Sequence, residues 1–150
     1  MLKPIVTATA IAGTLDILAA FILAGMNGVG PVQVLQFVAS GPFTDAMFGS
    51  PAYAFLGLLV HFAIMACMAA AYLLASGQFP ILNRSPIRWG VIYGLLLWFV
   101  MNWIVTPLRW PETGAPSGFR TIATQLFCHI VLVGIPIAIV AARFHMRRRA

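Results

Sequence analysis

Charged side chains are absent from three long stretches of this sequence. No Asp, Glu, Lys or Arg lies between Asp45 and Arg84, between Arg88 and Arg109, or between Arg120 and Arg143. A helix needs about 20 mostly apolar residues to cross the hydrocarbon of a bilayer. Each stretch is long enough for one crossing. The N-terminal residues 5–26 add a fourth, in which Asp16 is the one charged residue. The pattern therefore predicts an all-α integral membrane protein.

Glycine and proline residues punctuate these stretches and set the expected boundaries. We expect one transmembrane domain, residues 1–150, with helices at residues 5–26, 52–75, 87–106 and 121–142 in an up-down four-helix bundle. An amphipathic stretch at residues 32–39 predicts a short interfacial helix in the first outer loop. Pro107 is expected to end the third helix near the outer face, and Pro136 is expected to kink the fourth.

Composition and charge support a membrane location. The chain is 61% hydrophobic and 8% charged, whereas a soluble domain carries about 25% charged residues. Cytoplasmic segments of membrane proteins collect Lys and Arg. With the N-terminus inside, the inner segments carry Lys3, Arg84, Arg88, Arg143, Arg147, Arg148 and Arg149, and the outer segments carry Arg109 and Arg120. We therefore expect both termini in the cytoplasm.

The net charge of +6 has a second interpretation, because basic patches also bind nucleic acid. Here the basic residues lie outside the predicted crossings, so we expect no nucleic-acid partner. Arg143, Arg147, Arg148 and Arg149 follow the last crossing and are predicted to bind anionic lipid headgroups. Membrane lipids are therefore the expected partners of the C-terminal segment.

Small residues recur at helical spacing in the second and third predicted helices. Ala63, Cys67, Ala71 and Ala75 share one face, and Gly90 and Gly94 form a GxxxG pair. Such faces let helices approach closely in lipid. They are compatible with a homo-oligomer or with a larger membrane complex. Cys67 and Cys128 are expected at different depths, so we predict two free thiols.

Three ionisable residues fall inside predicted crossings: Asp16, His61 and His129. Counted along their helices at 1.5 Å per residue, all three lie roughly 12–16 Å below the outer interface. Ionisable groups at membrane depth are costly, so each is a candidate for function. Their common depth predicts a shared site.

Further polar residues extend this predicted site. Asn102 and Gln125 are expected to complete a polar intramembrane cluster with Asp16, His61 and His129. Thr106 and Arg109 follow Asn102 on one stripe of the third helix and are expected at the outer mouth. The sequence thus predicts a polar path from the outer surface to mid-membrane.

Several interpretations of this cluster remain open. It suits a path for protons, ions or a small solute, because imidazole titrates near neutral pH and offsets the charge of Asp16. His61 and His129 are also candidate metal ligands, either as the axial pair of a haem b or, with Met65 and Met68, for copper(I). An interhelical bond that only fixes packing, as in a structural accessory subunit of a larger complex, is the third interpretation.

Motifs of common enzymes are missing from the sequence. It contains no GxxxxGK[ST] phosphate-binding loop, no HExxH and no GxSxG. The acidic residues Asp16, Asp45 and Glu112 lie far apart in the chain. We therefore do not expect a hydrolase of the usual kinds, and nothing here indicates another enzyme.

Three short segments stand out in the predicted helices: VHFAI at residues 60–64 with AY at 71–72, FVMN at residues 99–102 with TPL at 106–108, and LFCH at residues 126–129. They resemble the conserved blocks of the YagU-like family of bacterial inner-membrane proteins. The resemblance covers the second to fourth predicted helices. It implies a multipass protein of a bacterial inner membrane without an established activity or cofactor, in which His61 and His129 are the positions to watch.

Overall fold

The computed structural model describes residues 1–147, except for the side chains of Asp45, Phe48 and Arg147. Within this range the secondary structure is all helical and no strand is present. Four helical stretches are long and apolar enough to cross a membrane: Leu2–Gly25, Ala52–Gln78, Pro86–Arg109 and Phe119–Met146. The prediction of an all-α chain with four helices of membrane-crossing length is confirmed.

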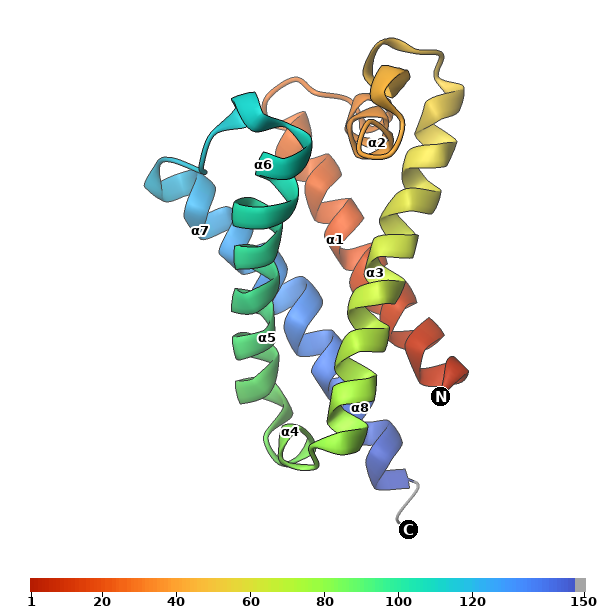
Figure 1. Cartoon of the computed structure of the whole chain (residues 1–150), viewed down its shortest axis with the longest axis vertical. Coiled ribbons are helices and arrows are strands. Elements are labelled where there is room, and N and C mark those ends of the chain that lie inside the picture. Colours follow the sequence, from red (N-terminus) through yellow and green to blue (C-terminus); the bar gives the residue numbers. More distant parts are fainter. Residues whose placement is uncertain (148–150) are drawn as a thin grey trace.

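The long helices lie side by side, and successive ones run in opposite directions (Figure 1). α1 (Leu2–Gly25) packs against α3 (Ala52–Gln78) and against α8 (Ile135–Arg147). α5 (Pro86–Val100) packs against α8 and against the wide helical segment η4 (Cys128–Gly134), which α7 (Phe119–Phe127) precedes.

Short elements distinguish the two ends of the molecule. α1 begins and α8 ends near α4 (Ile81–Arg84), and we call this the α4 end (Figure 1). The opposite end carries α2 (Pro31–Ala39) and α6 (Thr106–Arg109), and we call it the α2 end. The 3-10 turns η1 (Thr44–Phe48) and η3 (Pro111–Thr113) follow α2 and α6 in the chain.

Glycine residues let two helix backbones touch between α5 and η4. A Cβ atom on Gly94 would stand 2.5 Å from the Cα of Ile130, and one on Gly90 would stand 2.6 Å from the Cα of Ile135. Gly134 faces the backbone of both glycines from the other side. The GxxxG pair of α5 is therefore a close helix contact within this chain. By contrast, Ala63, Cys67 and Ala71 on α3 are exposed.

The apolar core fills the space between the helices from mid-height toward the α4 end. Its buried members are Ala8, Ala12, Met65, Ala69, Tyr72, Leu73, Leu97, Val133, Ile137, Ala138 and Ala141. Many are alanines, which keeps the helix axes close together. This packing closes the bundle of helices below the polar residues described next.

Two prolines lie just after wide π-helical turns. η2 (Met101–Val105) precedes Pro107, and η4 ends just before Pro136. Proline lacks an N–H and its ring clashes with the carbonyl four residues earlier, and a wider turn relieves that clash. The prediction that Pro107 ends the third helix is wrong, because helical conformation continues through α6 to Arg109. The other boundaries differ from those predicted by up to about one turn.

Candidate functional site

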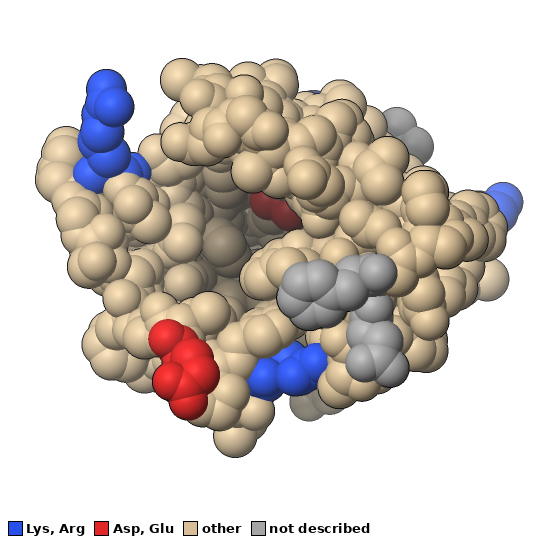
Figure 2. Space-filling model, turned by 90° about the horizontal axis from the view of Figure 1, so that it is seen from above, with Lys and Arg blue, Asp and Glu red and all other residues tan. Residues whose placement is uncertain are grey.

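A cavity of about 410 Å³ lies among the long helices. It opens at the α2 end, where a view along the helices looks into a hollow with an acidic side chain inside it (Figure 2). The lining residues are Asp16, Phe37, Val38, Gly41, Pro42, Val60, His61, Ile64, Met65, Met68, Met101, Val105, Thr106, Arg109, Trp110, His129 and Val133. Segments far apart in the sequence therefore line one space that is open at the α2 end.

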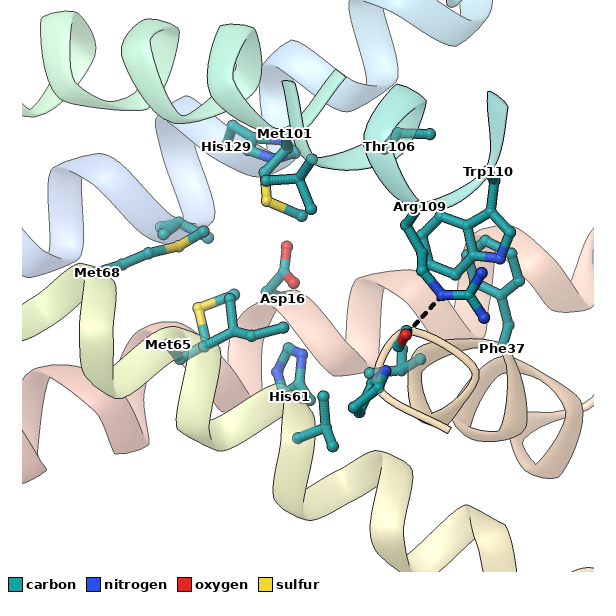
Figure 3. A pocket seen from close by; sticks show the side chains of 17 residues that line it. Asp16, Phe37, His61, Met65, Met68, Met101, Thr106, Arg109, Trp110 and His129 are labelled. Carbon is teal, nitrogen blue, oxygen red and sulfur yellow. Dashed lines mark hydrogen bonds between the residues drawn. The ribbon is translucent and has the colours of Figure 1, made fainter. Parts of the chain in front are cut away.

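Asp16 reaches this space from the middle of α1 (Figure 3). Its carboxylate is half-buried and interacts electrostatically with both His61 and His129. No hydrogen bond or ion pair joins it to any residue that the structure describes. A carboxylate at this depth without a fixed partner is costly, so its position calls for an explanation beyond packing.

His61 is a buried residue of α3 whose ring is fixed by a bond to α1. Its Nε2 lies 2.9 Å from the carbonyl oxygen of Gly13. A carbonyl only accepts, so Nε2 carries the proton and Nδ1 is the nitrogen left to accept. The neighbouring Phe62 packs edge-on against the imidazole, with ring centroids 5.2 Å apart.

His129 is fixed in the opposite sense, within its own helix. Its Nδ1 lies 2.8 Å from the carbonyl oxygen of Gln125, one turn earlier. By the same argument Nδ1 carries the proton and Nε2 is left to accept. Each imidazole therefore has a defined neutral tautomer and one nitrogen that can take up a further proton.

Arg109 closes the rim of the cavity by holding the end of α2. Its Nη2 donates to the carbonyl of Ser40 at 2.6 Å, and its Nε donates to the carbonyl of Gly41 at 2.6 Å. A cation at the C-terminal end of a helix satisfies free carbonyls and complements the helix dipole. Trp110 extends this contact, since its ring stacks on Phe37 with centroids 4.8 Å apart.

The structure brings together part of the residue set expected from sequence. Asp16, His61, His129, Thr106 and Arg109 all line the cavity. Asn102 and Gln125 are not among the lining residues. Both form hydrogen bonds with Trp98 instead. The Asn102 amide donates to the backbone carbonyl of Trp98 at 2.9 Å, and the indole N–H of Trp98 donates to the Gln125 side chain at 3.1 Å.

The wide turn η2 accounts for this difference in the third long helix. A π-turn adds a residue to the helical repeat and rotates the side chains that follow. Met101 faces the cavity in place of Asn102. The sequence signal for such a turn is Pro107, but a proline is equally typical of a helix end.

Three methionines, Met65, Met68 and Met101, also line the cavity (Figure 3). Among the described residues no group of three or more His, Cys, Asp or Glu is arranged to hold a metal ion. In Figure 3 the carboxylate of Asp16 lies between His61 and His129, where a bis-histidine haem would need space for its ring. That position of the carboxylate does not fit a haem b ring held between the two histidines.

The structure describes only some of the arginines that are predicted to bind lipid headgroups. Arg143 lies near the end of α8 and shares a second, apolar-walled cavity of about 410 Å³ with Lys3 of α1. The side chain of Arg147, and the whole of Arg148 and Arg149, fall outside the described residues.

Comparison of the chain with family models, with curated proteins and with solved structures finds no match. The resemblance to YagU-like proteins therefore stays a prediction. What can be inferred about function comes from the cavity and its residues.

Proposed function

We propose that this chain is a multipass protein of a bacterial inner membrane that takes a small solute into the cavity in exchange for a proton. Asp16 is the charged group of the site, and His61 and His129 are its proton-accepting neighbours. The observation that carries the proposal is the placement of Asp16, which faces an open cavity without a fixed partner among the described residues.

The orientation follows from the distribution of basic residues. Both termini and α4 are placed in the cytoplasm, because Lys3, Arg84, Arg88 and Arg143 lie toward that end of the helices. The cavity then opens outward. The four long helices form an up-down bundle. The amphipathic helix α2 lies at the outer membrane interface and packs against α3.

The geometry supports binding better than an open pore. The cavity ends on the core residues Met65 and Val133, and further apolar packing lies beyond them. Exchange across the membrane therefore requires a second conformation, while binding from the outside does not. A purely structural interhelical pair is less consistent with the site, because the two histidines bond to backbone carbonyls and no hydrogen bond or ion pair joins the described Asp16 to either of them.

The accessory-subunit interpretation keeps one specific observation in its favour. Ala63, Cys67 and Ala71 form an exposed small-residue face on α3, and faces of this kind suit contact with another transmembrane helix. Assembly through that face, with a second copy or with another subunit, is compatible with the solute site, since Ala63, Cys67 and Ala71 are not among the lining residues.

Binding of small solutes to the purified protein tests the proposal. Calorimetric titration with three probes of similar shape, benzyltrimethylammonium, 3-phenylpropionate and neopentylbenzene, covers a cation, an anion and a neutral molecule. We expect at least one to bind. Repeating the titration in buffers of different ionisation enthalpy then counts the protons exchanged, and Asp16→Asn should abolish that exchange.

A matched pair of variants controls for the place of binding. Val105 lines the cavity and Val131 does not, and the two are similarly exposed, at 38% and 42%. Val105→Trp should block the cavity and abolish binding, whereas Val131→Trp should leave it intact. Absence of binding for all three probes, or proton exchange that persists in Asp16→Asn, would contradict the proposal.

A further inference from the structure

The charges that face Asp16 define what the cavity can accept. His61 approaches from α3, and His129 and Cys128 approach from η4. Arg109 lines the same cavity from α6, but its guanidinium donates to the carbonyls of Ser40 and Gly41. Each imidazole is fixed to a backbone carbonyl through one nitrogen, and Asp16 is the one acidic side chain that lines the cavity and is not engaged by a described residue.

The remaining walls are apolar and polarizable. Apart from Thr106 and the groups just named, the lining consists of aliphatic, aromatic and methionine side chains. Aromatic faces and thioether sulfurs attract organic cations more than they attract anions. A cavity of a few hundred Å³ with apolar walls and a few polar groups is of the size that small organic ligands occupy.

We propose that the solute is a small organic monocation with an apolar body, an alkyl- or arylammonium, and that Asp16 is its counter-ion. This inference rests on the proposed function and names the class of its solute. An organic anion would meet the carboxylate with no free cation beside it. A divalent metal ion would lack the three hard or nitrogen ligands that it prefers.

The binding step balances without a further reactant. A protonated Asp16 releases its proton, the ionised carboxylate pairs with the cation, and the net charge of the cavity is unchanged. The proton leaves the cavity for bulk water. Because cation and proton compete for one carboxylate, binding should strengthen as the pH rises.

Titration calorimetry of the wild-type protein with benzyltrimethylammonium and neopentylbenzene isolates the contribution of charge, because the two probes have nearly the same shape. We expect the cation to bind and the neutral hydrocarbon to bind at least about tenfold more weakly. Asp16→Asn should weaken binding of the cation by a similar factor, and Asp16→Glu should retain it. Glu112→Gln removes an exposed carboxylate outside the cavity and serves as the matched control.

The outcomes separate this inference from the proposed function. Equal affinity for the two probes in the wild-type protein, or tighter binding of 3-phenylpropionate, overturns the cation assignment and leaves a solute cavity. Failure of all probes overturns both. If Asp16→Asn does not fold, the comparison of the probes on the wild-type protein still shows whether the cavity prefers a cation.

Discussion

The two ends of this molecule hold their helices together by different means. Toward the α4 end, backbones touch at glycines and the space between helices is filled by alanine and leucine-sized side chains. At the α2 end the helices separate around a cavity, and a single arginine joins α6 to the end of α2. The same four helices are thus tightly packed where nothing needs to enter and held apart where a site is proposed.

This difference indicates how an apolar chain keeps a cavity open in a membrane. Lipid supplies little hydrophobic force to close a gap between helices, so packing contacts decide where they meet. Gly90, Gly94 and Gly134 fix the crossing of α5 with η4. The wide turns η2 and η4, which precede Pro107 and Pro136, lie in these same two helical stretches at the level of the cavity.

The largest expected effect comes from breaking the glycine contact. Gly94→Ala places a Cβ 2.5 Å from the carbonyl oxygen of His129 and from the Cα of Ile130, and these backbone atoms cannot move aside independently. We expect a loss of about 3 kcal/mol in the free energy of unfolding, measured by reversible unfolding in mixed detergent. Gly25→Ala meets nothing within 4 Å and should be neutral or slightly stabilising; equal losses in both variants would contradict the contact.

The next effect comes from releasing the rim. Arg109→Gln removes the charged donor from the carbonyls of Ser40 and Gly41, which should cost about 2 kcal/mol because bonds to charged groups contribute about 1.5–3 kcal/mol. Amide hydrogen exchange in α2 should accelerate while exchange in α8 stays unchanged. Arg109→Lys keeps the charge but not the two-point geometry, so its stability and its exchange rates in α2 should lie between those of the wild type and of Arg109→Gln. Uniform acceleration in all helices would indicate a general loss of folding instead.

Replacing the carboxylate should act in the opposite direction. Asp16→Leu removes a partnerless charge at membrane depth, so we expect a gain of about 1 kcal/mol in stability together with loss of solute binding. A purely structural bond between Asp16 and a histidine predicts a loss of stability instead. Unfolding in mixed detergent, run beside the binding titration, distinguishes the two.

The smallest expected effect concerns the polar residue turned away from the cavity. Asn102→Leu removes a bond within its own helix, so it should change the free energy of unfolding by less than about 0.6 kcal/mol, the average for a side-chain hydrogen bond between membrane helices, and should leave solute binding unchanged. Thr106 lines the cavity, so Thr106→Val should alter solute binding while changing the free energy of unfolding by a similar amount. If Asn102→Leu weakened binding more than Thr106→Val, the lining of the cavity would have to be revised.

Much of the fold was predictable because it depends on simple properties of the sequence. Long uncharged stretches predict crossings whatever the detailed packing, and four helices of that length are present. The common depth of Asp16, His61 and His129 also followed from counting residues along straight helices, and these residues do line one cavity.

Other features depend on departures from straight helices and on distant contacts. Asn102 and Gln125 were placed by ideal periodicity, which the π-turns of η2 and η4 alter. The partners of Arg109 are backbone carbonyls, and no side-chain pattern marks them. The tautomers of His61 and His129 likewise depend on carbonyl groups whose positions become known only in three dimensions.

Thiol labelling tests most directly whether Asp16 faces a cavity open to one side. In a background of Cys67→Ala and Cys128→Ala, Asp16→Cys in oriented vesicles should react with a membrane-impermeant trimethylammonium thiosulfonate added from the outside. Ala12→Cys, one turn nearer the α4 end at a position that is fully buried, should stay unmodified. An Asp16→Cys chain that folds but resists the reagent from the outside, or reacts only from the cytoplasmic side, would contradict the outward-facing site.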